Sequence, residues 1–175
     1  MNTNLNNFNR KELWHTSPNE IKEIYNSLLF DDCLFFSSEP YVMTSSNIVF
    51  YYTLKLSDDE VIEREQFYFL SCQELEKIAP VLNEIKNLLN CTADEAHDYL
   101  IKDPDYWSLF KDAEEASEKS WRMQALCGKA ACLLGYKACQ DKDEQGSVYI
   151  VPMTGRLKAL TLEKIEENGT IKWTK

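Results

Sequence analysis

The sequence predicts an α+β fold. Stretches rich in β-branched and aromatic residues lie toward both ends of the 175-residue chain, and apolar residues at helical spacing fill its middle. Strands and helices do not alternate regularly and there is no internal repeat, so a doubly wound parallel sheet is not expected. We expect residues 1–11 to form a flexible polar arm and residues 12–175 to form a single domain, the default for this length.

The first third of the chain is predicted to hold strands and one helix. Ser17, Pro18 and Glu20 form a capping box that is followed by apolar residues at helical spacing. This pattern is typical of a helix N-terminus, so a helix is expected after Ser17. Runs of β-branched and aromatic residues predict the strands of this part. They are residues 13–15, 33–37, 47–56 and 66–70.

The middle of the chain is predicted to be helical. Residues 75–89 carry apolar side chains at helical spacing, and Thr92 with Glu95 forms a second capping box. Residues 112–134 are expected to be the longest helix, which Gly135 ends as a C-terminal cap. The remaining residues return to strand patterns separated by Gly-containing turns. The expected strands there are residues 136–140, 147–151, 157–162 and 170–173.

Charge and composition exclude several classes of protein. The formal net charge is −10 at pH 7, which argues against direct nucleic-acid binding because such proteins neutralise phosphates with clustered Lys and Arg. The charge favours solubility or a basic partner. No apolar run is long enough to cross a bilayer, so no membrane association is expected. The Asn-rich opening lacks the blocks of a secretory signal, and we expect a cytoplasmic protein.

Cysteine and glycine spacings exclude several kinds of site. The six cysteines are expected to be thiols in a reducing cytosol, and none is paired as C-x-x-C. Only His15 and His97 could complete a metal site, so no metal is expected. The five glycines form neither G-x-G-x-x-G nor a P-loop, so a bound nucleotide would be held in another way.

The first candidate site patch is His15, Thr16 and Ser17. A strand that ends at His15 and turns into a helix at Ser17 would present a ring nitrogen, hydroxyls and backbone amides at a helix N-terminus. Such groups can bind the hydroxyls, carbonyls and phosphates of a nucleotide. The alternative is that Ser17 only caps the helix and His15 only packs.

The second patch is the aromatic strand at residues 34–38 with the nearby Tyr41. Phe35 and Phe36 are adjacent, so one faces the core and the other can form an aromatic wall for a nicotinamide ring. Ser37 follows them, and Tyr41 is a second stacking candidate. The alternative is that both phenylalanines belong to the core.

The third patch is the acidic group before the strand at residues 147–151. Asp141, Asp143 and Glu144 are close together, followed by Gln145. Such a carboxylate can orient a ribose hydroxyl and stabilise the positive charge that develops as nicotinamide leaves. The alternatives are a solvated acidic hairpin or the paired carboxylates of a glycosidase.

Six stretches form a pattern together. They are His15-Thr16-Ser17-Pro18, Leu34-Phe35-Phe36, Tyr41-Val42-Met43-Thr44, Ser120-Trp121 with Gln124-Ala125, Lys129-Ala130-Ala131 with Leu134-Gly135, and Asp143-Glu144-Gln145-Gly146. Through them the chain resembles a phage-encoded anti-CRISPR family that ADP-ribosylates the type I-F Cascade surveillance complex. The resemblance runs from Trp14 to about Lys164.

The resemblance implies a fold and an activity. The fold would be an ADP-ribosyltransferase-like split mixed or antiparallel sheet with inserted helices. The activity would be NAD-dependent transfer of ADP-ribose, with NAD as co-substrate, to an Asn side chain on the PAM-recognising large subunit of type I-F Cascade. That modification would block binding of target DNA, and the protein would act in the cytoplasm of the bacterial host cell.

The resemblance also assigns roles to residues of this chain. His15, Thr16 and Ser17 would hold NAD, together with Ser37 and Gln145. Phe36 or Tyr41 would flank the nicotinamide. Asp143 would be the catalytic acid, with Glu144 as second choice. These roles require folding to bring His15 and Asp143 to one shared groove.

Two other functions remain open at this point. The net charge of −10 is compatible with a non-enzymatic acidic decoy that occupies a basic nucleic-acid channel. The same chemistry could also serve a toxin that modifies a different acceptor. An enzyme acts substoichiometrically and only with NAD, whereas a decoy needs about one copy per target.

Overall fold

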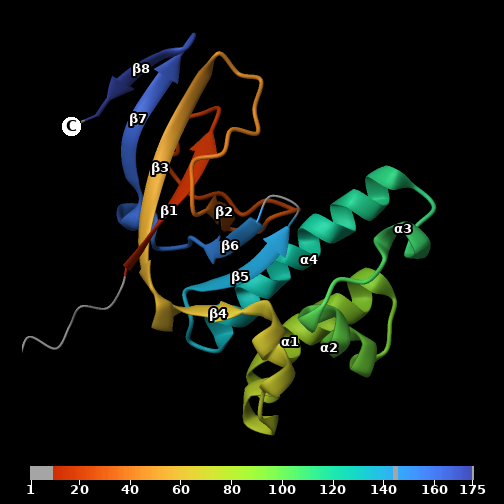
Figure 1. The fold of residues 1–175 in the computed structure, drawn as a ribbon. Helices are drawn as coiled ribbons and strands as arrows, with labels where there is room; N and C mark the ends of the chain where they lie inside the picture. The colour runs from red at the N-terminus through yellow and green to blue at the C-terminus, as the bar shows by residue number, and fades with distance from the viewer. Residues whose placement is uncertain (1–9, 144–145, 175) are drawn as a thin grey trace, which may run out of the picture.

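The predicted α+β class is confirmed by the computed structural model, which describes residues 10–143 and 146–174 (Figure 1). These residues form an eight-stranded mixed sheet in the order β4-β5-β6-β2-β1-β3-β7-β8. The strands are β1 (Arg10–Ser17), β2 (Cys33–Ser37), β3 (Ile48–Ser57), β4 (Val61–Glu63), β5 (Ala138–Asp143), β6 (Gly146–Pro152), β7 (Thr161–Glu167) and β8 (Thr170–Trp173). β1 begins at Arg10, so the last two residues of the expected polar arm belong to a strand.

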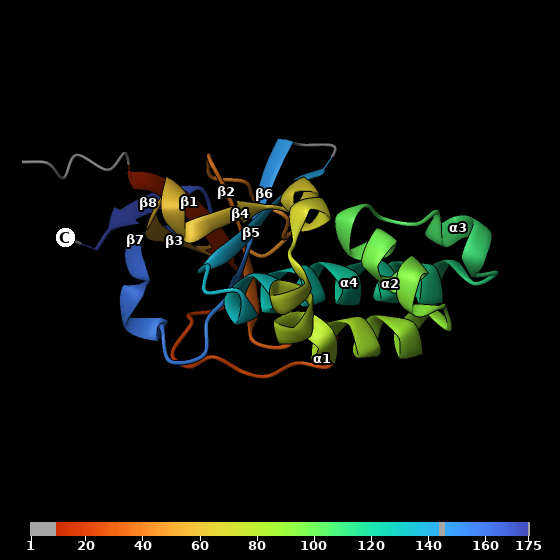
Figure 2. The same cartoon turned by 90° about the horizontal axis from the view of Figure 1, so that it is seen from below.

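The helices gather in a lobe that extends away from the sheet (Figures 1 and 2). This helical lobe consists of α1 (Cys72–Leu89), α2 (Ala93–Ile101), α3 (Tyr106–Leu109) and α4 (Ala113–Leu133). Three short 3-10 helices are η1 (Asp58–Glu60), η2 (Arg64–Phe69) and η3 (Leu157–Ala159). Within the described part of the chain, no helix has the length and apolar character needed to span a membrane.

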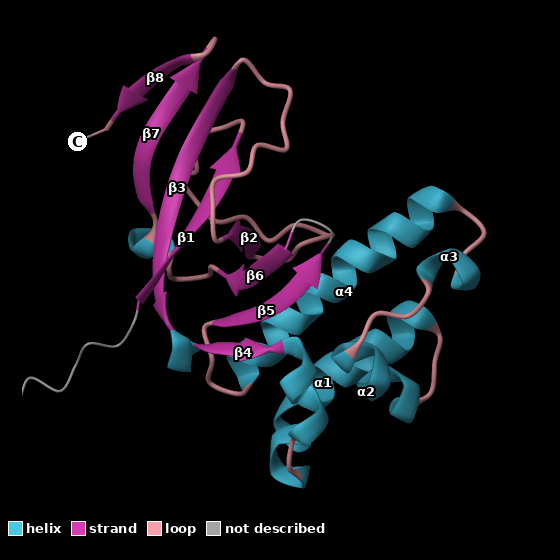
Figure 3. Cartoon of the chain, viewed as in Figure 1, coloured by secondary structure: helices cyan, strands magenta, loops and turns pink. Residues whose placement is uncertain are grey.

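The sheet is split where β1 meets β2. Antiparallel pairing joins β1 to β3 along its whole length and β2 to β6 along its whole length. Between β1 and β2 the register consists of the single pair Trp14–Ser37. Figure 3 shows the result, with β3, β7 and β8 running steeply across the direction of β4, β5 and β6. Backbone groups near the split therefore face one another without a continuous ladder.

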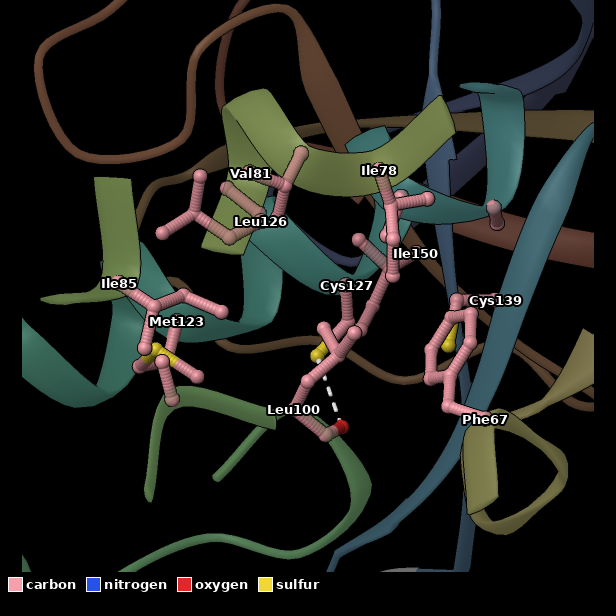
Figure 4. Close-up of a cluster of buried hydrophobic side chains, with 14 of the residues drawn as sticks. Phe67, Ile78, Val81, Ile85, Leu100, Met123, Leu126, Cys127, Cys139 and Ile150 are labelled. Carbon is pink, nitrogen blue, oxygen red and sulfur yellow. Dashed lines mark hydrogen bonds between the residues drawn. The ribbon is translucent and has the colours of Figure 1, made fainter. Parts of the chain in front are cut away.

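The larger core lies between the helical lobe and the β5–β6 half of the sheet. α4 crosses these strands, and Figure 4 shows its side chains Met123, Leu126 and Cys127 facing residues of α1 and Ile150 of β6. Gly128 permits this close approach, since a Cβ there would lie 2.8 Å from Ile150 Cγ2 and 3.3 Å from Cys33 Sγ. The absence of a side chain at Gly128 thus lets α4 lie directly on the sheet.

A second core lies on the opposite face of the sheet. Its members come from five strands and the segment after β6, and they are Leu13, Phe36, Leu54, Leu56, Ala138, Tyr149, Val151 and Met153. Ile24 and Leu160 pack against this cluster from irregular segments. Both faces of the central strands are therefore covered, which explains why they read as continuous apolar runs rather than alternating ones.

A buried guanidinium joins the lobe to the sheet. Arg64 is 4% exposed, and its Nη1 lies 2.7 Å from Asp103 Oδ2 and 2.6 Å from Asp141 Oδ2. The same side chain donates to the carbonyls of Tyr99 and Leu100 at the end of α2. Because a buried charge is costly unless it is paired, this network fixes α2 and the loop after it against β5.

The helix expected after Ser17 is absent, and that prediction is wrong. Residues 18–32 form bends and turns with the isolated bridge Ser27–Asp31. Ser17 is paired with Phe50 as the last residue of β1, so its backbone is extended. Its hydroxyl donates to the carbonyl of Asn19 in a local turn. Backbone pairing of Ser17 with β3 overrides the local preference of the capping box for a helix. The residues that follow run across the second core, where Ile24 packs.

The strand expected at residues 66–70 is also wrong, because the chain there forms η2. Arg64 and Phe67 point inward, a spacing of three residues that matches a 3-10 helix and not the period of two of a strand. Residues 157–162 begin as η3, and the strand starts at Thr161. The expected strand at 136–140 begins at Ala138 and extends to Asp143. The helices expected at residues 75–89, after Thr92 and at residues 112–134 are confirmed as α1, α2 and α4.

The seat of α4 on β6 generates the first prediction. Gly128→Ala is expected to lower the free energy of unfolding by about 1–3 kcal/mol, because the added methyl overpacks the contact with Ile150. Alanine favours helix over glycine by about 1 kcal/mol, so the sign itself is informative. Urea unfolding measures the difference, with Ser117→Ala on the same helix as control. A Gly128→Ala protein more stable than wild type would contradict the close packing.

The Arg64 network generates the second prediction. Arg64→Ala is expected to cost about 3 kcal/mol or more of unfolding free energy, because Asp141 and Asp103 lose their partner in a partly dry site. Lys55→Ala removes an exposed ion pair with Glu12 and is expected to cost less than about 1 kcal/mol. Urea unfolding of both variants at neutral pH makes the comparison. Equal small losses would show that the network does not hold the lobe.

Candidate functional site

The three candidate patches lie on four neighbouring strands. β5, β6, β2 and β1 are adjacent in the sheet in this order. The acidic group begins on β5, the aromatic residues lie on β2 and the His-Thr-Ser patch lies on β1. Segments more than a hundred residues apart in the sequence are thus brought to one region. Which of their side chains can meet depends on the face of the sheet to which each one points.

The strand register assigns these faces. Trp14 pairs with Ser37, Ser37 with Val148, and Val148 with Asp141, so these four side chains share a face. Side chains alternate along a strand. The candidate residues divide accordingly, with Thr16, Ser37 and Asp143 on the face that carries the helical lobe and His15, Ser17 and Phe36 on the other.

The expected shared groove of His15 and Asp143 is therefore wrong. The two residues are on β1 and β5, with β2 and β6 between them, and point to opposite faces. Figure 2 shows the outer ends of β5 and β6 on the opposite side of the molecule from residues 18–32, the segment that follows β1. The sequence pattern could not reveal this, because it fixes which residues are in strands but not the register between distant strands.

His15 is a structural residue of the split. Its Nδ1 lies 2.8 Å from the carbonyl oxygen of Phe35, and its ring centroid is 5.5 Å from that of Phe36. Burial lowers the pKa of His15, outweighing the hydrogen bond to Phe35, which favours the charged form. A carbonyl only accepts, so Nδ1 carries the proton of a neutral ring. His15 thereby supplies a β1–β2 contact where the ladder is interrupted.

Phe36 belongs to the core. It is 1% exposed and packs in the second core cluster, so its ring is not available as a wall for a ligand. Tyr41, in contrast, is exposed in the segment between β2 and β3. Of the two aromatic residues proposed to flank a nicotinamide, Tyr41 is the one that solvent can reach.

Thr16 fixes the segment that carries Tyr41. The Thr16 hydroxyl donates to the carbonyl of Tyr41 at 2.5 Å, and the Ser37 hydroxyl donates to the carbonyl of Glu39 at 2.5 Å. Both hydroxyls lie on the lobe-side face of the split. Thr16, Ser37 and Tyr41 therefore form a polar, partly aromatic rim beside β2.

Asp143 lies at the far end of this same face. It is exposed and pairs with Gly146 across the β5–β6 hairpin, where Gly146 adopts φ +122°. Two strand spacings, about 10 Å, separate β5 from β2, a distance that a bound nucleotide can bridge. Glu144 and Gln145 lie outside the described residues. The neighbouring carboxylate of Asp141 is engaged by Arg64, so it is structural.

A groove of about 460 Å³ lies between β1 and residues 19–34. His15 and Ser17 line it together with Asp31 and Asp32, an acidic pair that the sequence reasoning did not single out. The signal was two carboxylates directly before a buried strand, the same pattern as at Asp143. Asp31 pairs with Arg122 at 2.7 Å and Asp32 accepts from the backbone of Thr154, so both have structural partners.

Comparison with known proteins finds similarity to a solved structure. No protein-family model matches the sequence, and no curated protein matches it. The structure is similar to a crystal structure described as that of an anti-CRISPR protein, with a TM-score of 0.51 and 20% sequence identity. The match covers 90% of this chain and 95% of the other. The two proteins share a fold that extends through the sheet and the helical lobe.

The neutral, buried His15 generates the third prediction. A histidine whose pKa is lowered by folding binds its proton more readily in the unfolded chain, so its contribution to stability is lost as pH falls below about 6.5. His15→Asn retains a donor near Nδ1 and does not titrate. Between about pH 7.5 and pH 5.5, wild type is expected to lose more unfolding free energy than this variant. Parallel pH profiles would contradict the buried neutral ring.

Proposed function

We propose that this protein inhibits a CRISPR–Cas system. The observation that carries the proposal is the fold shared with an anti-CRISPR protein over nearly the whole of both chains. The resemblance of the sequence to an anti-CRISPR family, argued from its motifs, supports the same role independently. A CRISPR–Cas effector protein is then the partner.

The proposed mechanism is transfer of ADP-ribose from NAD to a side chain, Asn in the family resembled, on the large subunit of type I-F Cascade. Two features of the fold support it. The three motif patches come to adjacent strands around a split in the sheet. Thr16, Ser37 and Asp143 share one face of that split, with Tyr41 exposed beside them.

Within this mechanism each residue has a role consistent with its position. NAD supplies the electrophilic ribose carbon and the nicotinamide leaving group. The Asp143 carboxylate orients the ribose and stabilises its developing positive charge. Tyr41 flanks the nicotinamide, and the hydroxyls of Thr16 and Ser37 hold the segment that carries Tyr41 in place. His15 acts as a positioning residue through Phe35, since it does not share the face with Asp143.

The fourth prediction tests this mechanism. Purified protein, intact type I-F Cascade and NAD labelled in the adenylate moiety are expected to give label on the large subunit. Asp143→Asn is expected to reduce the rate about 10²-fold or more, because one preorganised electrostatic contact is lost. Asp59→Asn, an exposed acid on η1, is the matched control and should retain full transfer.

Two results would contradict the mechanism. If no subunit of an intact complex carries label, the protein does not transfer ADP-ribose to Cascade. Full activity of Asp143→Asn would show that Asp143 is not the catalytic acid, and Glu144, the next acid in the sequence, would then be tested. Unfolding curves of both variants control for misfolding. Mass spectrometry of the labelled subunit identifies the acceptor and separates this proposal from a toxin with another target.

The net charge of −10 favours a second candidate, an acidic inhibitor that acts without chemistry. Inhibition by such a decoy needs about one copy of the protein per complex, is independent of NAD and weakens steeply with salt. The proposed enzyme inhibits at substoichiometric amounts and requires NAD. A titration of Cascade DNA binding with and without NAD separates the two.

A further inference from the structure

The negative charge of the chain is concentrated at the outer end of the helical lobe. Residues 93–118 hold nine carboxylates and two lysines, and all nine carboxylates are exposed. They are Asp94, Glu95, Asp98, Asp103, Asp105, Asp112, Glu114, Glu115 and Glu118. Among the described residues, Asp103 is the one member of this set that forms an ion pair, with Arg64. In the described part of the chain, the other eight form no ion pair within 4 Å.

Apolar side chains are exposed among these acids. Trp107 is 69% exposed and Leu109 is 47% exposed on α3. Their neighbour Tyr106 is buried and donates to Asp103, so α3 is anchored and presents Trp107 outward. Figures 1 and 2 both show α3 and the start of α4 at the end of the lobe remote from the sheet. An exposed Trp with a rim of charge is typical of a protein interface.

We propose that this acidic end, residues 93–118 with Trp107 at its centre, docks on a basic protein surface of the target. The inference rests on the proposed function, because a CRISPR effector must hold nucleic-acid phosphates with Lys and Arg. The charge itself excludes other occupants. Nucleic acid and anionic lipid are repelled, and so is a second copy of this acidic chain.

The acidic end is joined through Arg64 to β5, the strand that carries Asp143. Arg64 binds Asp103, which lies within the acidic end, and also Asp141, two residues before Asp143. Docking through the lobe thus holds β5 in a fixed orientation on the target. In this proposal the acidic end supplies affinity and orientation, and the residues on the lobe-side face of the split carry out the transfer of ADP-ribose.

The test uses binding of the full-length protein to type I-F Cascade without NAD. The double variant Asp98→Lys/Glu118→Lys changes two acids in helix interiors of the docking end. The control Asp59→Lys/Glu76→Lys makes the same change in net charge at exposed positions outside it. The docking variant is expected to bind at least tenfold more weakly and with a shallower dependence on salt, whereas the control keeps most of the affinity.

A second pair of variants tests the apolar contact. Trp107→Ala is expected to weaken binding about tenfold, and Trp173→Ala, similarly exposed at 65% on β8, should bind as wild type. Equal affinities within either pair would overturn the docking proposal, as would absence of binding by wild type. Label transfer from NAD is measured separately, so transfer that persists with equal affinities leaves the proposed function standing while docking fails.

Discussion

The buried guanidinium of Arg64 connects the two halves of this molecule. It lies in η2, directly after β4, and it binds the end of α2, the following loop and β5. A charge this deeply buried is tolerated because Nε, Nη1 and Nη2 of the guanidinium all donate hydrogen bonds to backbone carbonyls or carboxylates. The lobe therefore cannot rotate relative to β5 without leaving a buried ion unpaired, and this ionic contact adds to the packing of α4 on β5 and β6.

Much of the fold could be predicted from the sequence. The helices α1, α2 and α4 follow from apolar periodicity and capping residues, because these signals act within one element. The failures occur where tertiary contacts override local preference. Ser17 carries a capping box, yet it pairs with Phe50 in the ladder. Arg64 and Phe67 turn the expected strand into η2, because one must reach the carboxylates and the other the core.

The candidate site was only partly predictable, for a related reason. Motif reasoning found residues on strands that the sheet brings together. It could not determine the side on which each residue lies, since a shift of one residue reverses every face. His15 was expected beside Asp143 and instead supports Phe35 from behind, while Thr16, its direct neighbour, shares the face of Asp143. The alternation of a strand decides between supporting and contacting roles.

The parallel pairing of β4 with β5 determines where the helical lobe is inserted. Val61 lies opposite Ala138 and Glu63 opposite Gln140, so the chain leaves the sheet at the end of β4 and re-enters it at the start of the neighbouring strand β5 after building the entire lobe. The two attachment points are on adjacent strands but at opposite ends of the paired segment. The lobe is therefore an insertion between two neighbouring strands, and its length can differ without any change in the order of the strands.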